Sequence, residues 1–86
     1  MDGLTEGRIV HYVLPNGQME GEHRPAIVVK VWRDISQYMQ EGRINLQVFT
    51  DFSNDGKEYE SGRYWATSVP YSEEPKPNTW HWIEKA

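Results

Sequence analysis

The sequence predicts a mainly β domain, a small five-stranded antiparallel barrel of the SH3-like or OB-like kind. Apolar residues recur at the two-residue period of strands, and β-branched and aromatic residues concentrate in five short segments. Proline, glycine and asparagine separate these segments at the spacing typical of small all-β folds. Because 86 residues leave room for one core, residues 1–86 are expected to form a single domain.

The predicted strands span residues 8–14, 25–32, 44–50, 63–69 and 79–83. The first ends at a Pro-Asn-Gly turn, residues 15–17. The second is a nearly continuous apolar run, which favours a central strand covered on both faces. Residues 34–41 are expected to hold at most one helical turn, capped by Asp34 or Ser36 and ended by Gly42.

Strand alternation divides the apolar residues into a core and a second face. The predicted core is Val10, Tyr12, Leu14, Ile27, Val29, Val31, Ile44, Leu46, Val48 and Val69, with one or two tryptophans. The second face is unusually apolar, comprising Ile9, His11, Val13, Val28, Trp32 and Phe49. Apolar area of this size marks a contact site, so we expect a homo-oligomer whose interface includes Ile9, His11, Val13, Val28 and Trp32.

Charge and composition exclude several functions. The net charge of −4 argues against binding duplex nucleic acid through its phosphates. The absence of cysteine excludes disulfides, thiolate metal sites and a cysteine nucleophile. The longest wholly apolar run, residues 26–29, is too short to cross a membrane. Because Asp2, Glu6 and Arg8 leave no hydrophobic segment at the start, we expect no secretory signal and a cytoplasmic protein.

Metal binding and catalysis are not predicted. Residues 51–56 (DFSNDG) match the first half of a calcium loop, but the twelfth position holds Gly62 instead of glutamate, so a tight turn with Gly56 at positive φ is expected. His11, His23 and His81 lie on different segments without ligand-like spacing, and His81 is expected to bond a backbone carbonyl. No serine or acid lies in a recognisable nucleophile setting, so an enzyme is not expected, nor a cofactor.

The aromatic residues are the strongest functional signal. Four tryptophans, five tyrosines and two phenylalanines exceed what a core of this size needs. Rings near arginines suit either a planar anionic ligand or a protein partner, and the sequence does not separate the two. For a nucleotide-like ligand, stacking is assigned to Phe49, Tyr71, Trp80 or Trp82, phosphate contacts to Arg24 and Arg63, and a ribose contact to Asn54 or Asp55.

Several segments together resemble a family of small proteins encoded by tailed bacteriophages and prophages. These are residues 5–12, 23–29 (HRPAIVV), 45–51 (NLQVFTD), 53–56 (SNDG) and 69–82 (VPYSEEPKPNTWHW). The resemblance implies a phage accessory protein acting in the host cytoplasm, and small proteins of this origin are often counter-defence factors. By analogy with other phage proteins, we expect a non-enzymatic homo-oligomer that sequesters a nucleotide-derived signal. The alternatives are a module that inhibits a host enzyme and a minor virion or assembly component.

Overall fold

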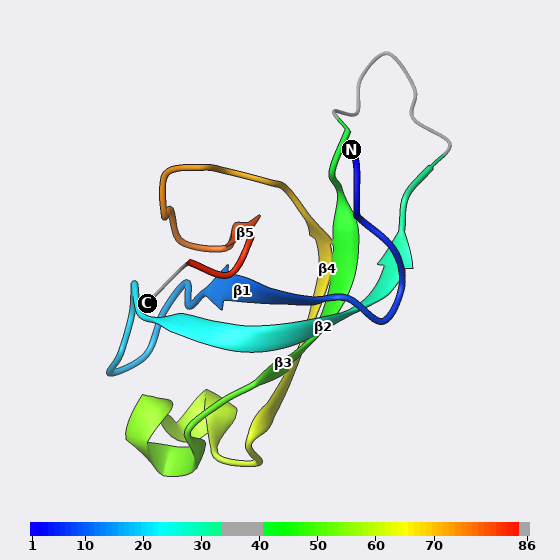
Figure 1. Cartoon of the computed structure of the whole chain (residues 1–86). Coiled ribbons are helices and arrows are strands. Elements are labelled where there is room, and N and C mark those ends of the chain that lie inside the picture. Colours follow the sequence, from blue (N-terminus) through cyan, green and yellow to red (C-terminus); the bar gives the residue numbers. More distant parts are fainter. Residues whose placement is uncertain (34–40, 85–86) are drawn as a thin grey trace.

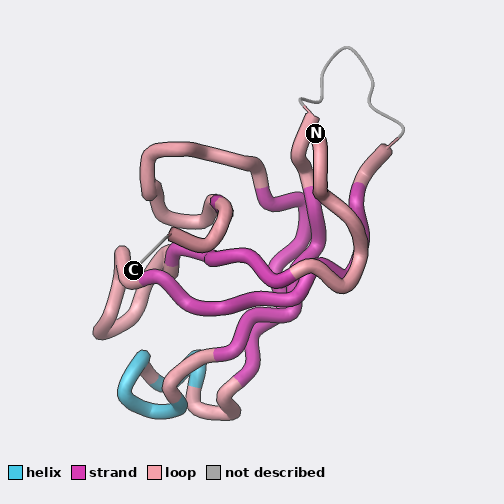
Figure 2. Tube along the Cα trace, in the orientation of Figure 1, coloured by secondary structure: helices cyan, strands magenta, loops and turns pink. Residues whose placement is uncertain are grey.

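The chain folds into one curled, half-barrel sheet of five antiparallel strands (Figure 1), as a computed structural model describes it for residues 1–33 and 41–84. The strands are β1 (Ile9–Val13), β2 (His23–Val31), β3 (Ile44–Phe49), β4 (Arg63–Val69) and β5 (Trp80–His81), in the order β4-β3-β2-β1-β5. The described helices are two short 3₁₀ turns between β3 and β4, η1 (Phe52–Asp55) and η2 (Lys57–Tyr59) (Figure 2). The mainly β prediction is confirmed.

Two further findings concern the helical segments. The helical turn expected over residues 34–41 lies, except for Glu41, outside the described residues. Within the described part of the chain, no helix has the length and apolar character needed to cross a membrane.

The segment that follows β4 pairs with β5, although β4 and β5 form the two edges of the sheet. The Trp80 amide donates a hydrogen bond of 3.1 Å to the Pro70 carbonyl, and the Ser72 amide donates one of 3.0 Å to the Trp80 carbonyl. An isolated bridge joins Tyr71 to Trp80. The sheet therefore curls far enough for the segment after β4 to pair with β5, which covers part of an otherwise open edge.

The core fills the concave side of this curled sheet. Its buried members are Leu4, Val10, Tyr12, Leu14, Ala26, Val28, Ile44, Leu46, Val48, Tyr59, Ala66, Val69 and Trp80. Trp80 is the largest fully buried side chain, and its indole N–H donates a 2.6 Å hydrogen bond to the Gly42 carbonyl. That bond satisfies the single polar atom of the ring, so the indole fills the core without an unpaired donor.

The alternation predicted for β2 is wrong over half the strand. Ala26 and Val28 point into the core, whereas Ile27 is partly buried and Val29 is exposed. The cause is a β-bulge. Val28 pairs with Leu46 and Lys30 with Asn45, so β2 advances by two residues where β3 advances by one. Val31 then packs against the core, and β2, although central, is buried on one face.

The convex, outer face of the sheet differs from the predicted second face. Val13 and Val28, expected at an oligomer interface, are each 1% exposed, and Trp32 is half-buried with its indole N–H bonded to Asn45 Oδ1. Among the apolar residues that remain on the surface are Ile9, Val29, Phe49 and Trp65. An apolar outer face therefore exists, but its membership differs from the prediction.

Candidate functional site

Three histidines occupy the same patch of the outer face, although each comes from a different strand. His11 of β1 lies directly opposite His81 of β5, and Val13 of β1 lies opposite His23 of β2. Since residues two apart on a strand and residues paired across strands share a face, all three imidazoles point outward on neighbouring strands. Tyr12 and Trp80, next to them in sequence, point into the core.

The three imidazole rings surround the carboxylate of Glu84. Ring centroids lie 5.8 Å apart for His11 and His81, 4.6 Å for His23 and His81, and 6.2 Å for His11 and His23. The Nδ1 atoms of His11 and His23 lie 3.1 Å from Glu84 Oε1 and Oε2, respectively, and His81 Nε2 contacts Oε1. Glu84 can reach them because it lies only three residues beyond His81, just after the end of β5. We call these four residues the His3Glu cluster.

The His3Glu cluster holds its carboxylate in the charged form. Partial desolvation acts to raise the pKa of Glu84, but hydrogen bonds from the three imidazoles outweigh it and lower this pKa to about 2. Glu84 thus presents two anionic oxygens to its neighbours at neutral pH.

His81 is the most buried member of the cluster, with 6% of its surface exposed. The hydrogen bond to a backbone carbonyl expected for this ring is not formed. Its Nε2 contacts Glu84, while its buried Nδ1 has no hydrogen-bond partner among the described residues. Among the described residues, the polar contact of the His81 ring is therefore the one with Glu84.

The geometry of the His3Glu cluster matches the needs of a metal ion. One ligand atom from each residue can be chosen so that all four lie within 4.8 Å of one another. A tetrahedral ion with bonds of about 2.0–2.1 Å would hold these atoms roughly 3.4 Å apart, so side-chain rotations of about an ångström close the difference. Three imidazole nitrogens and one carboxylate oxygen form a donor set that zinc and other late first-row metals accept.

A shallow depression of about 500 Å³ adjoins the cluster. Its lining residues are Glu22, His23, Arg24, Pro25, Phe49, Thr50 and Asp51. His23 thus belongs both to the cluster and to this depression. Phe49, on the far side, is 41% exposed and lies opposite Arg63 in the register of β3 and β4.

Arg24, predicted to bind phosphate, is instead joined to Asp55. Its Nε and NH2 atoms donate hydrogen bonds of 2.8 and 2.6 Å to the two carboxylate oxygens of Asp55, which is fully buried. The hydrogen bonds from Arg24 lower the pKa of Asp55 despite desolvation. Arg24 NH1 also donates to the His23 carbonyl at 2.9 Å, so the ion pair braces β2 beside the cluster. Neither residue is free to bind a nucleotide in this arrangement.

The other predicted ligand-binding residues separate into buried and exposed groups. Trp80 is buried, and Tyr71 and Trp82 pack edge-on against it with centroids 5.0 and 5.1 Å away. Asn54 donates from its side chain to Asp51 Oδ2. Phe49 and Arg63 remain exposed side by side on the outer face, and Trp65, which the prediction omitted, lies two residues beyond Arg63 on that face.

The loop over residues 51–56 is a turn, as expected, but it contains the η1 helix rather than a tight hairpin. Gly56 has φ of 120°, as predicted for a residue that must reverse the chain. Asp55, one of its proposed oxygen donors, is occupied by Arg24, so this loop lacks a free set of ligands.

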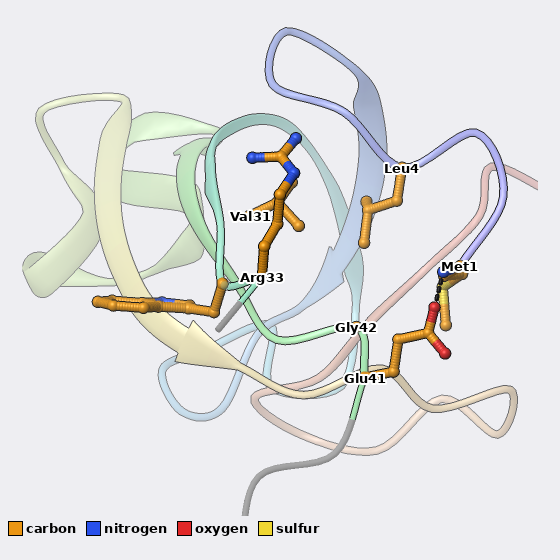
Figure 3. Close-up of a pocket in the computed structure, with 7 residues that line it drawn as sticks. Met1, Leu4, Val31, Arg33, Glu41 and Gly42 are labelled. Carbon is orange, nitrogen blue, oxygen red and sulfur yellow. Dashed lines mark ion pairs between the residues drawn. The ribbon is translucent and has the colours of Figure 1, made fainter. Parts of the chain in front are cut away.

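A second cavity lies near the N-terminus, beside the end of β2 (Figure 3). It has a volume of about 230 Å³ and is lined by Met1, Leu4, Val31, Trp32, Arg33, Glu41 and Gly42. Its charged groups are already paired: the Met1 amine contacts Glu41, and Arg33 makes two 2.7 Å bonds to Glu6. The charged groups of this cavity are therefore engaged in ion pairs within the protein.

Sequence reasoning missed the His3Glu cluster because it judged the three histidines by their spacing along the chain and found no pair with ligand-like spacing on one segment. Their convergence depends on the pairing of β1 with β5, whose partners lie 70 residues apart. The alternation along β5 predicted that His81 and Trp80 point to different faces of the sheet. This is confirmed, because Trp80 lies in the core and His81 faces the cluster. The available signal was that three strands on one side of the sheet each carry an outward histidine, with an acidic residue three positions after the last.

Comparison of the chain with protein-family models, with curated proteins and with solved structures finds no match.

Proposed function

We propose that this protein binds a divalent transition-metal ion through His11, His23, His81 and Glu84. The observation that carries the proposal is the convergence of four ligand atoms within 4.8 Å on three paired strands and the segment that follows them. In the metal-free protein the facing ring nitrogens donate to Glu84. When each proton is lost or moves to the other nitrogen of its ring, three lone pairs face a common point, and a cation there would be bound by all three imidazoles together with the Glu84 carboxylate. A cluster of three protonated histidines would instead hold like charges 4.6–6.2 Å apart around one carboxylate.

The donor set favours zinc over calcium or magnesium. Calcium and magnesium prefer six or more oxygen ligands, whereas three of these four ligand atoms are imidazole nitrogens. Zinc takes four nitrogen or oxygen ligands without a geometric preference of its own, and copper and nickel compete for the same atoms. Zinc is therefore the first ion to test.

Titration with Zn²⁺ and with Co²⁺, followed by calorimetry and by the visible absorption of cobalt, tests the proposal. We expect one ion per chain and the intense cobalt bands of a four-coordinate site. His11→Gln and His23→Gln, whose side chains are partly exposed, should each weaken the affinity at least about tenfold while the fold survives. Glu60→Gln, an exposed acid that belongs neither to the cluster nor to the depression, is the matched control and should leave affinity unchanged.

Two results would overturn the metal proposal. One is a folded wild-type protein that shows no saturable binding of either ion. The other is affinity that His11→Gln and His23→Gln leave at the wild-type level, because binding would then occur elsewhere. Circular dichroism of each variant separates loss of the site from loss of the fold.

A second proposal, from the sequence, is that the protein is a non-enzymatic phage factor that sequesters a nucleotide-derived signal. Phe49, Arg63 and Trp65 support it, because two exposed rings and a guanidinium lie together on the outer face. Arrangements of this kind suit stacking and contact with an anion. Binding rather than catalysis is proposed since the described hydroxyls of Thr50, Ser61, Ser72 and Thr79 donate to backbone carbonyls, not to a base.

Assembly belongs to the same proposal. The exposed Ile9, Val29, Phe49 and Trp65 support a homo-oligomer, and the pairing of residues 70–72 with β5 supports a closed SH3-like or OB-like barrel. Intact-complex mass spectrometry of protein from infected cells tests sequestration, since a retained small molecule is expected. A stoichiometric host protein would favour enzyme inhibition, and recovery in purified particles would favour a virion component.

A further inference from the structure

We infer that the metal ion of the His3Glu cluster keeps an exchangeable position, at which the anionic group of an aromatic ligand replaces Glu84. This inference rests on the proposed metal binding and adds the class of ligand: a planar ring that carries a phosphate, such as a nucleoside monophosphate. The ring would extend from the metal across Pro25 to Phe49.

Glu84 is held less firmly than the histidines. His11, His23 and His81 belong to strands, where backbone pairing fixes their position. Glu84 lies three residues beyond His81, outside any strand, and its side chain is 50% exposed. Among the ligand atoms, its carboxylate is therefore the one that an external anion can displace with the least disturbance of the fold. Three fixed histidines with one exchangeable position are a donor set that zinc uses when it binds an external ligand.

A row of residues leads from the metal ligands to an exposed ring. His81 pairs with His11, and His11 pairs with Pro25. The next strand continues the row, because the pairing of Ala26 with Val48 places Phe49 beside Pro25, and both line the depression. Phe49 in turn pairs with Arg63. Two strand spacings, about 10 Å in all, separate the backbone of His11 from that of Phe49.

The surface of Pro25 and Phe49 suits a planar group. Proline presents a flat apolar ring with no donor, and Phe49 offers an exposed aromatic face. Arg63, at the far end of the row, adds a guanidinium that stacks on a base or contacts a second anionic group. A ligand that spans the row thus meets a Lewis acid at one end and apolar faces at the other.

The charges around the depression should make binding of an anionic ligand depend on the metal ion. Glu22 and Asp51 line the depression, and the charge of Arg24 is balanced by Asp55. Together with Glu84, Glu22 and Asp51 make the metal-free site acidic, so it should repel a phosphate. A divalent ion would reverse the sign next to His23 and supply an attraction that is missing at this end of the row, since Arg63 lies at the other end. We therefore expect the ligand to bind the metal-loaded protein and not the metal-free one.

The experiment uses the full chain loaded with Co²⁺ and titrated with AMP, with ribose 5-phosphate and with adenosine. AMP should alter the cobalt absorption spectrum and bind at least about tenfold more tightly than to the metal-free protein. Ribose 5-phosphate should change the spectrum but bind more weakly, because it lacks the ring, and adenosine should leave the spectrum unchanged. Phe49→Ala should weaken AMP about fivefold or more without changing cobalt affinity.

The control is Phe52→Ala, which removes an exposed ring outside the row and should leave AMP binding unchanged. Glu84→Ala should weaken cobalt binding and preserve the spectral response to AMP. The inference fails if cobalt binds but AMP leaves its spectrum unaltered, or if AMP binds equally well without metal. If cobalt itself does not bind, the proposed metal site fails first, so the two failures are distinguishable.

Discussion

Replacing Asp55 with alanine is expected to destabilise the fold strongly. The carboxylate is fully buried, accepts two hydrogen bonds from Arg24 and a third, of 2.7 Å, from the Asp51 amide. Without it, the largely buried guanidinium and that amide lose their acceptor. Breaking a buried ion pair from one side costs about 3–5 kcal/mol, because the remaining charge stays desolvated.

This magnitude is a large part of the total stability. Domains of this size unfold with a free energy of about 5–15 kcal/mol, and each kcal/mol shifts the melting temperature by roughly 4–8 °C. Asp55→Ala should therefore lower the melting temperature by roughly 12 °C or more. Since Arg24 NH1 also holds the His23 carbonyl, the variant should weaken metal binding as well.

Thermal and urea unfolding followed by circular dichroism measure the effect, with Glu6→Ala as the matched control. Glu6 accepts two hydrogen bonds from Arg33, as Asp55 does from Arg24, but both side chains are exposed. An exposed pair contributes about 1 kcal/mol or less. Equal destabilisation by Asp55→Ala and Glu6→Ala would refute the reasoning, because burial would then make no difference.

Three further predictions concern stability. Because the pKa of folded Asp55 is lowered, its stabilisation is complete above the ordinary aspartate pKa of about 4 and is lost as the pH falls below that value; urea unfolding should show a steeper acid dependence for the wild type than for Asp55→Asn. Trp80→Phe removes the bond to the Gly42 carbonyl and should cost about 1–3 kcal/mol, measured by urea unfolding. Gly17→Ala should destabilise by about 1 kcal/mol or more in the same assay, since φ is 91° and the new Cβ would lie 2.4 Å from the Asp55 carbonyl oxygen; a neutral result would show that this turn relaxes.

Local sequence patterns predicted the position of β4 and the buried face of β3. β4 has the bounds expected from the sequence, and in β3 the alternation of Ile44, Leu46 and Val48 correctly assigned the buried face. β2 failed because its bulge changes the phase between Val28 and Val31, and the sequence there is apolar at nearly every position. Where nearly every residue is apolar, the sequence does not alternate between apolar and polar positions. It therefore gives no sign of which residues face the core or of where the bulge shifts them.

A second bulge shows why such features escape local reasoning. In β4, Ala66 pairs with Leu46 and Val69 with Ile44, so the strand holds one residue more than its partner. Ser68 takes φ of 50° there, and its amide donates a 2.8 Å bond to Asn45 Oδ1. The side chain that satisfies the bulge is 23 residues distant, so neighbouring sequence gives no sign of it.

The candidate site was less predictable than the fold for the same physical reason. Arginine near aromatic residues suggested an anion site, but whether Arg24 is free depends on Asp55, which a distant loop brings to it. Likewise, the histidines share a site only when β5 pairs with β1. Residue type indicated which groups are able to bind, whereas long-range pairing decided which of them are available.

If the His3Glu cluster binds a metal ion as proposed, its position would couple metal binding to the completion of the fold. β5 has only two residues, so its backbone pairing with β1 on one side and with residues 70–72 on the other is short. A metal ion that joins His81 and Glu84 to His11 and His23 would cross-link this strand to β1 and β2, closing a loop of about 70 residues in the same way as a disulfide would. The free energy of metal binding would then add directly to the stability of a small domain with no cysteine to staple it. The strand β5, which closes the sheet, also carries His81, the most buried of the proposed ligands, so a single ion would stabilise both the site and the closure of the sheet.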